Sequence, residues 1–149
     1  MNPPVSTPAI KVVKSVREQV SAEEWQARVD LAACYRLTAI YGMTEMIANH
    51  ISCRVPGTTD HFLINPYGML YEEIDASCLI KVDCNGNTLF NASDYHVNAA
   101  GFVIHSAIHM ARHDVDCVAH THGGLGYGMR AAAAGANLDA VPPHRLSRF

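Results

Sequence analysis

Residues 115–122 read Val-Asp-Cys-Val-Ala-His-Thr-His, a short apolar run that ends in two histidines one residue apart. The run predicts a buried β-strand. Successive side chains of a strand point to opposite faces, so we expect His120 and His122 to face the same way and to offer two nitrogens to one divalent metal ion. A catalytic metal site needs about three protein ligands and a structural site about four. The pair is therefore half of a metal site, or else two histidines that only form hydrogen bonds at the end of a sheet.

Two segments have the residue spacing of amphipathic helices. Ser21 followed by Glu24 predicts a capping box, and the helix that begins there is expected to end at Gly42. The apolar residues at helical spacing in this segment are Trp25, Val29, Ala32, Leu37 and Ile40. In the second predicted helix, from about 98 to 112, they are Phe102, Ile104, Ile108 and Ala111.

Four short segments between these helices are predicted to be strands. They are 49–55, where polar and apolar residues alternate, 61–64, 79–83 and 88–90. Turn residues at 56–57, 65–68 and 84–87 separate them and favour antiparallel pairing. The order of helix, strands, helix and strand indicates an α/β domain in which helices pack on a mainly antiparallel sheet.

The composition indicates a single globular domain. The 149 residues are 49% hydrophobic and 17% charged, which suffices for a core. The net charge is −3 and the basic residues are scattered, which argues against a nucleic-acid or membrane partner. No apolar run could span a bilayer and the first residues lack a signal-peptide pattern, so we expect a cytoplasmic protein. The five cysteines show no CxxC spacing and are expected to be reduced core residues.

Other residues that could carry chemistry have weaker patterns. The spacing of His105, His109 and His113 suits zinc ligands on a helix, but Ser106 stands where a metalloprotease has its glutamate. We interpret the three as surface histidines or as histidines that support a neighbouring site. Asn49 and Gly68 lie in turns that could bind an anion or could be ordinary turn residues. Most of the isolated histidines, at positions 50, 61, 96 and 144, are expected to have no special role, and Cys117 lacks a cation that would activate its thiol.

Five segments together resemble the class II aldolase/adducin family in order and spacing. They are 41–44 (Tyr-Gly-Met-Thr), 49–57 (Asn-His-Ile-Ser-Cys-Arg-Val-Pro-Gly), 62–68 (Phe-Leu-Ile-Asn-Pro-Tyr-Gly), 101–109 (Gly-Phe-Val-Ile-His-Ser-Ala-Ile-His) and 120–122 (His-Thr-His). The resemblance implies a three-layer α/β/α domain with a mainly antiparallel central sheet, and assembly into homo-oligomers. In such aldolases zinc is bound by the His-x-His pair, a later histidine and a glutamate at the start of the preceding helix, and it acts as a Lewis acid on a small, sugar-like substrate. The resemblance makes His120 and His122 metal ligands, and Asn49 and Gly68 substrate contacts.

The chain departs from the family pattern at two places. Nineteen residues before His120, where the sugar-phosphate aldolases carry the acidic residue, this sequence has Gly101, which can neither bind a metal nor accept a proton. Tyr67 stands where a serine is expected to contact phosphate. After His122, an alanine- and glycine-rich stretch replaces the expected helix, strands and third histidine, so the C-terminal part of the domain is expected to be missing.

We therefore divide the chain into a flexible N-terminal arm (1–20), a class II aldolase/adducin-type domain (21–122) and an atypical tail (123–149) that a truncation or reading-frame change would explain. With two histidines, the chain is expected to bind zinc or another divalent metal weakly or not at all, and to be an impaired or inactive metal-dependent lyase. The alternative function is a non-catalytic, adducin-like assembly or binding module, related to the cytoskeleton, that needs no metal. Gly101 favours this alternative, whereas the histidine pair favours the lyase.

Overall fold

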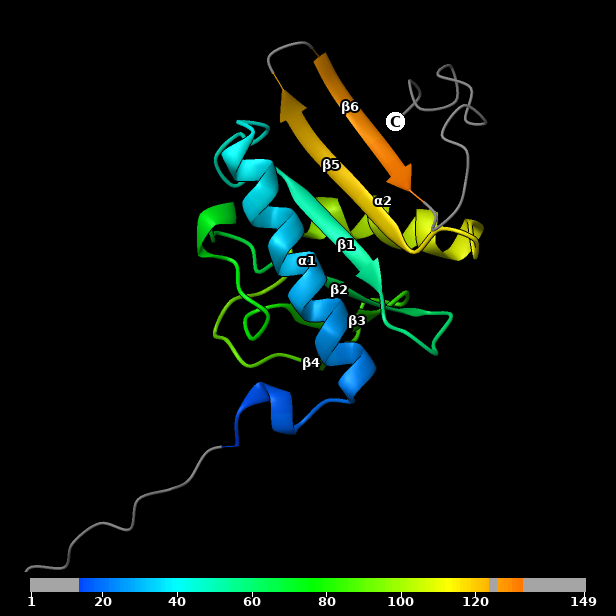
Figure 1. The fold of residues 1–149 in the computed structure, drawn as a ribbon. Coiled ribbons are helices and arrows are strands. Elements are labelled where there is room, and N and C mark those ends of the chain that lie inside the picture. Colours follow the sequence, from blue (N-terminus) through cyan, green and yellow to red (C-terminus); the bar gives the residue numbers. More distant parts are fainter. Residues whose placement is uncertain (1–13, 124–125, 133–149) are drawn as a thin grey trace, which may run out of the picture.

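Two helices lie on opposite faces of one antiparallel sheet (Figure 1). The computed structural model describes residues 14–123 and 126–132. Its elements, in chain order, are η1 (Val16–Glu18), α1 (Ala22–Ile40), β1 (His50–Arg54), β2 (His61–Ile64), η2 (Tyr71–Glu73), β3 (Ile80–Asp83), β4 (Thr88–Phe90), α2 (Ala99–Ala111), β5 (Cys117–Gly123) and β6 (Gly126–Ala132). Helix α1 crosses the front of the sheet and α2 lies behind it, which confirms the predicted α/β/α layering.

The sheet has the strand order β4-β3-β2-β1-β5-β6, and all neighbouring strands are antiparallel. The predicted strands are all present. Strand β1 is central: Ser52 lies opposite Ile64 of β2 on one side and opposite Val118 of β5 on the other. Strand β6 was not anticipated, because its glycines and alanines have low strand propensity, yet it pairs with β5 from Gly126 to Ala132.

On the α1 side, strand β1 contributes Ile51 to an apolar core. Tyr35 of α1 joins the layers there: its hydroxyl accepts the N–H of Ile51 at 3.0 Å and lies 2.9 Å from Oδ1 of Asn65. The ring of Tyr35 therefore packs in the core, and its hydroxyl forms hydrogen bonds there. The buried members of this core are Leu31, Tyr35, Ile51, Val55, Leu63, Tyr71, Ile74 and Leu79.

The buried face of α1 differs from the predicted apolar stripe. Ser21 caps the helix as predicted, because its Oγ accepts the N–H of Glu24 at 3.1 Å. The residues that the helix buries are Glu24, Arg28, Leu31, Ala32, Tyr35 and Thr38. The predicted stripe residues Val29, Leu37 and Ile40 are instead exposed. Hydrophobic periodicity misplaced the face because a charged pair takes two of the buried positions.

That charged pair is Glu24 with the fully buried Arg28. Nε and Nη2 of Arg28 donate to Oε1 of Glu24 at 3.0 and 2.9 Å, and Nη1 donates to the Leu79 carbonyl at 2.7 Å. Nζ of Lys81 lies 2.7 Å from the other oxygen of Glu24. These contacts hold α1 against the beginning of β3.

The buried face of α2 also differs from its predicted stripe. Asn98 caps the helix by accepting backbone N–H groups of the first turn. The residues that α2 buries are Gly101, His105, Ser106 and His109, whereas Phe102, Ile104 and Ile108 are half-buried and Ala111 is exposed. Of the two interpretations of His105 and His109, the one as surface histidines is therefore wrong, and the one as histidines that support a neighbouring site stays open. Of the predicted trio only His113, beyond the helix end, is exposed.

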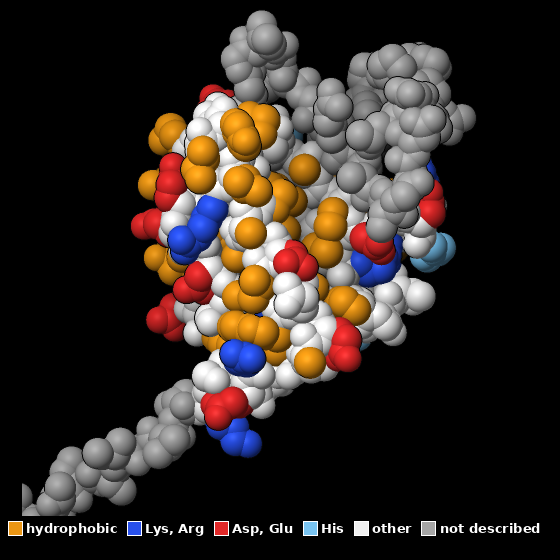
Figure 2. Space-filling view, in the orientation of Figure 1, with side chains coloured by type: hydrophobic (Ala, Val, Ile, Leu, Met, Phe, Trp, Pro, Cys, Tyr) orange, Lys and Arg blue, Asp and Glu red, His pale blue; other side chains and the backbone are white. Residues whose placement is uncertain are grey.

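The outer side of α1 exposes several large apolar side chains among polar ones. Figure 2 shows hydrophobic side chains in a row along this helix, and the exposed large ones on and just after it are Val29, Leu37, Ile40, Tyr41, Met43 and Met46. All five cysteines are free thiols, as predicted, but only Cys84 is buried. Within the described residues, no helix has the length and apolar character needed to cross a bilayer.

The pairing of Glu24 with Arg28 generates a stability prediction. Glu24→Gln removes one charge and leaves Arg28 buried without a counter-charge, so we expect a loss of about 3–5 kcal/mol in the free energy of unfolding. Glu23→Gln, on the exposed side of the same helical turn, is the matched control and should change it by less than about 0.5 kcal/mol. Urea unfolding measures both, and equal losses in the two variants would contradict the role of the buried pair.

Candidate functional site

Most of the predicted site residues gather at one end of the sheet, where β1 begins and β5 ends (Figure 1). Asn49 directly precedes β1, and His50 of β1 lies opposite His120 of β5. Gly101 lies in the first turn of α2, against the ring of His50. The turn that contains Gly68 follows β2, whose last residues pair with β1. Antiparallel pairing therefore brings together segments that are far apart in the sequence.

His50 and Gly101 are in close contact. A Cβ atom built on Gly101 would lie 2.6 Å from Cδ2 and 2.8 Å from Nε2 of His50. Side-chain atoms do not pack at such distances, so any other residue at position 101 would displace the imidazole. The ring of His50 thus occupies the space in which a side chain of residue 101 would begin.

A chain of hydrogen bonds runs from His50 into the layer between β1 and α2. Nδ1 of His50 lies 2.9 Å from Nε2 of His105, and Nδ1 of His105 lies 2.6 Å from Oγ of Ser52. The same oxygen lies 2.8 Å from Nε2 of His109. We call His50, Ser52, His105 and His109 the histidine–serine network. All four residues are buried, so the network belongs to the interior of the domain.

Arg54 completes the contact of β1 with α2. Its Nη2 donates to the carbonyls of His109, Arg112 and Val115, at 2.9, 3.2 and 3.2 Å, where α2 ends. A cation at a helix C-terminus is favoured because the carbonyls there lack helical partners. The alternating residues His50, Ser52 and Arg54 therefore form a polar strand face that α2 covers.

Two histidines of the network, His105 and His109, have lowered pKa values and are held neutral. Burial, reinforced by the neighbouring His50, His109 and His120, lowers the pKa of His105 well below its usual value. Burial and then the charge of Arg54 lower the pKa of His109 to about 4. Within the described residues, Nδ1 of His109 has no hydrogen-bond partner, so a proton added there would be buried without an acceptor.

The structure places the two predicted substrate contacts in different surroundings. Asn49 is buried, and its Oδ1 accepts the N–H of Glu45 at 2.6 Å. Its Nδ2 has no hydrogen-bond partner among the described residues, although such an amide normally has one when it is buried. Gly68 has a φ of +101°, which the turn after β2 requires, and it lies near the ring of Tyr95. Neither arrangement by itself identifies a ligand.

The predicted metal ligands are described to different extents. His120 Nδ1 lies 3.4 Å from Nε2 of His50. The backbone of His122 pairs with Tyr127, and the side chain of His122 falls outside the described residues. In the part of the chain that the structure describes, no three His, Cys, Asp or Glu side chains are grouped so that they could hold a metal ion.

The sequence alone places His50 among the isolated histidines and so misses its contacts with His105 and Gly101. His61 lies near Asp60 and the ring of His96 lies beside Tyr67, so these two do stand apart from the network. The residue pattern contained a usable signal: His50 and Ser52 share a strand face, and His105 and His109 share a helix face. When both faces are buried, their polar groups need hydrogen-bond partners, and here each face supplies partners for the other.

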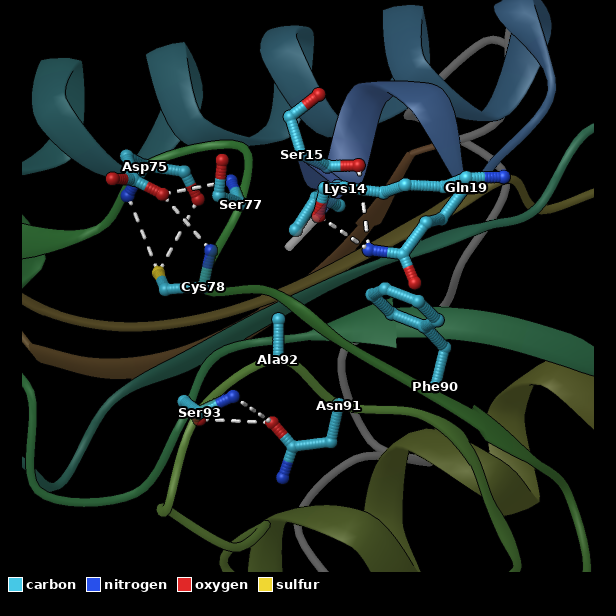
Figure 3. Close-up of a pocket in the computed structure, with 11 residues that line it drawn as sticks. Lys14, Ser15, Gln19, Asp75, Ser77, Cys78, Phe90, Asn91, Ala92 and Ser93 are labelled. Carbon is cyan, nitrogen blue, oxygen red and sulfur yellow. Dashed lines mark hydrogen bonds between the residues drawn. The ribbon is translucent and has the colours of Figure 1, made fainter. Parts of the chain in front are cut away.

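The structure also has a pocket of about 590 Å³ away from these histidines (Figure 3). It lies between the η1 segment and the loops 75–78 and 90–93. Its polar groups bond within their own loops: Oδ1 of Asp75 accepts the N–H groups of Ser77 and Cys78, and Oδ1 of Asn91 accepts that of Ser93. None of the predicted site residues lines it, so it is not the candidate site.

Comparison with known proteins agrees with this architecture and with the motifs at the end of the sheet. The sequence model described as "Class II Aldolase and Adducin N-terminal domain" matches residues 29–142. The chain belongs to this family.

Relatives within the family have different names. A protein of Pseudomonas aeruginosa named "Putative aldolase class 2 protein" is 59% identical over 111 residues, which are 74% of this chain and 42% of that protein. Alpha-adducin of Rattus norvegicus is 43% identical over 80% of this chain and 16% of that protein. The solved L-fuculose 1-phosphate aldolase from Glaciozyma antarctica PI12 is 33% identical with a TM-score of 0.66, over 76% of this chain and 45% of that one. This chain thus spans less than half the length of these relatives.

The contact between His50 and Gly101 generates a second prediction. Gly101→Ala should lower the free energy of unfolding by about 1–3 kcal/mol, because the new methyl group overlaps the imidazole. In the His50→Ala background the same substitution should be neutral or stabilising by up to about 1 kcal/mol, since alanine is the better helix former. Urea unfolding of both single variants and the double variant gives the coupling energy. Equal effects of Gly101→Ala in the two backgrounds would contradict the contact.

The lowered pKa of His109 predicts a pH-dependent stability. In the unfolded chain histidine takes up a proton near pH 6.5, whereas in the folded protein His109 does so only near pH 4. Between these values the unfolded state binds more protons, so stability falls as the pH is lowered from 6.5 to 4, by about 3 kcal/mol from this residue. His109→Gln should flatten the slope of unfolding free energy against pH, and His113→Gln, at an exposed site, should not. An unchanged slope in His109→Gln would contradict the assignment.

Proposed function

We propose that this chain carries part of a class II aldolase-type site, in which a divalent cation and a sugar-like carbonyl substrate meet at the end of the sheet where β1 begins and β5 ends. The observation that carries the proposal is the convergence of Asn49 and His120 at this end, next to the first turn of α2. These segments come from three different parts of the sequence.

His120 and His122 are the residues that would hold the cation. Neutral imidazole nitrogens are ordinary zinc ligands, and two of them on one strand face can bind one ion. When bound, a divalent cation would supply Lewis-acid polarisation of a substrate carbonyl. The described residues provide fewer than three grouped ligands, which is why we expect weak binding from the histidine pair alone.

Asn49 would contact the substrate. Its Oδ1 is held by the N–H of Glu45, so Nδ2 has a fixed direction, and this donor has no partner within the described part of the chain. A buried N–H donor of this kind gains most from an oxygen acceptor, such as a hydroxyl or phosphate oxygen of a sugar. Gly68 would contribute backbone N–H groups of its turn. The likeness to an L-fuculose 1-phosphate aldolase supports a ketose phosphate as the first substrate class to test.

Gly101 sets a limit on the activity. A glycine offers no group that takes or gives a proton, so we expect slower turnover than in a relative with an acid at this position. This same residue supports the second candidate, an adducin-like binding module without metal, and the 43% identity to alpha-adducin supports it as well.

A zinc titration combined with a retro-aldol assay on a panel of ketose phosphates separates the two candidates. We expect zinc binding that is lost in His120→Gln, and zinc-dependent cleavage of at least one substrate, however slow. His61→Gln, a histidine on β2 away from the network, is the control and should behave as the wild type. Oligomerisation without zinc binding or cleavage would contradict the lyase and favour the binding module.

A further inference from the structure

We propose that Cys53 of β1 and Cys117 of β5 form a redox-active thiol pair, which a low-molecular-weight disulfide such as oxidised glutathione converts into a disulfide bond between the two strands. This pair goes beyond the proposed function and does not depend on it. Cys53 packs against the core beneath α1, whereas His50 of the candidate site packs against α2, on the other face of the sheet.

The position of the two cysteines in the sheet suits a disulfide bond. Cys53 and Cys117 lie directly opposite each other in the antiparallel pairing of β1 with β5. Just beyond them, the backbone N–H of Arg54 donates to the carbonyl of Asp116 at 2.7 Å. Hydrogen-bonded and non-hydrogen-bonded pairs alternate along such a ladder, so the cysteines form a non-hydrogen-bonded pair, in which Cα atoms are about 4.5 Å apart. Disulfide bonds join residues whose Cα atoms are about 4.4–6.8 Å apart.

The two side chains also share a face of the sheet. Cys53 and Ala119 both pack against the apolar core beneath α1. Residues two apart in a strand point the same way, so Cys117 lies on the same side as Ala119. Opposite side chains approach most closely in a non-hydrogen-bonded pair. The thiols of Cys53 and Cys117 are accordingly in hydrogen-bond contact with each other.

The two thiols differ in acidity, which assigns them different tasks. Their mutual hydrogen bond, followed by burial, raises the pKa of Cys53. The same hydrogen bond lowers the pKa of Cys117, although burial and the carboxylates of Asp116 and Asp30 act in the opposite direction. The thiolate is the form that attacks a disulfide, so Cys117 is the sulfur that reacts first. The neighbouring thiol thus takes the place of the cation that Cys117 lacks.

Both cysteines keep contact with solvent. Cys53 and Cys117 are half-buried, whereas Cys84 is buried. Thiol–disulfide exchange requires that the reagent reach the attacking sulfur. Cys53 and Cys117 therefore combine partial exposure with a partner on the opposite strand.

The exchange proceeds in two balanced steps. The thiolate of Cys117 attacks one sulfur of glutathione disulfide, forms a mixed disulfide and releases one glutathione thiolate. Cys53 then loses its proton, and its thiolate attacks Sγ of Cys117, which forms the Cys53–Cys117 bond and releases the second glutathione thiolate. Two protein thiols are oxidised, one glutathione disulfide is reduced to two glutathione molecules, and these take up the two thiol protons.

Cys34 of α1 is the alternative partner for Cys117. It is exposed, and burial of its sulfur, followed by the electrostatic effect of Cys117, raises its pKa. It lies on a helix, so no strand pairing holds it opposite Cys117. The direct register of β1 with β5 favours Cys53 as the partner.

Equilibration of the 149-residue chain in glutathione buffers of increasing oxidised fraction tests the proposal. Free thiols are alkylated at each step, and mass spectrometry of the proteolysed chain identifies the linked cysteines. We expect one intramolecular disulfide, between Cys53 and Cys117. Its equilibrium constant should be at least about tenfold larger than for the same pair in urea, or about 30 mV in reduction potential, because the folded sheet holds the two sulfurs together.

Variants test the assignment of the two cysteines. At the buffer composition that oxidises the wild type, Cys53→Ser and Cys117→Ser should each leave all remaining thiols open to alkylation. Cys78→Ser replaces another half-buried cysteine, one whose sulfur contacts Asp75, and is the matched control that should keep the disulfide. Thermal unfolding verifies that each variant is folded, and the linkage map of the wild type does not depend on any variant.

Three results would overturn the proposal. The first is a folded wild-type chain that forms no disulfide in any of the buffers. The second is a linkage map that joins Cys117 to Cys34 instead of Cys53. The third is an equal equilibrium constant in buffer and in urea, since the folded sheet would then contribute nothing to the pairing.

Discussion

The close approach of α2 to β1 at Gly101 is the constraint on which the candidate site depends. With no Cβ atom at this position, the helix backbone lies against the His50 ring at a distance that no other residue allows. The His50 ring therefore lies between the first turn of α2 and strand β5, where it contacts His120. A glycine that looked like the loss of a catalytic acid is, in the structure, the reason that an imidazole reaches this place.

The two faces of β1 differ in chemical character, one being apolar and the other polar. Toward α1 the strand builds an apolar core around Tyr35 and Ile51, which contributes stability through burial. Toward α2 it presents His50, Ser52 and Arg54, which are satisfied by side chains and carbonyls of that helix. In such a buried polar layer each group needs a hydrogen-bond partner in the correct position. These hydrogen bonds therefore fix the position of α2 relative to β1. Such fixed positions are what a metal site requires.

Much of the architecture could be predicted from the sequence, because strand alternation, turn residues and the Ser21 cap are local signals. The faces that the helices bury could not. Arg28 and His105 take positions that hydrophobic periodicity assigns to apolar residues, and their burial depends on partners more than fifty residues away, Leu79 for one and Ser52 for the other. The sequence singled out Asn49, Gly68, His120 and His122, and their roles stay predictions. It overlooked the contacts of His50, because a single histidine in an alternating strand resembles a solvent-facing residue. Strand β6 was missed because glycine and alanine carry no strand signal.

The central claim is the proposal that a divalent cation binds through His120 and His122 at the end of the sheet where β1 begins and β5 ends. An anomalous difference map at the zinc absorption edge, from crystals of the zinc-loaded 149-residue chain, tests it most directly. The account predicts one peak at bonding distance, about 2.0–2.1 Å, from ring nitrogens of His120 and His122. A peak bonded only to other residues, or no peak at this end of the sheet, would contradict it.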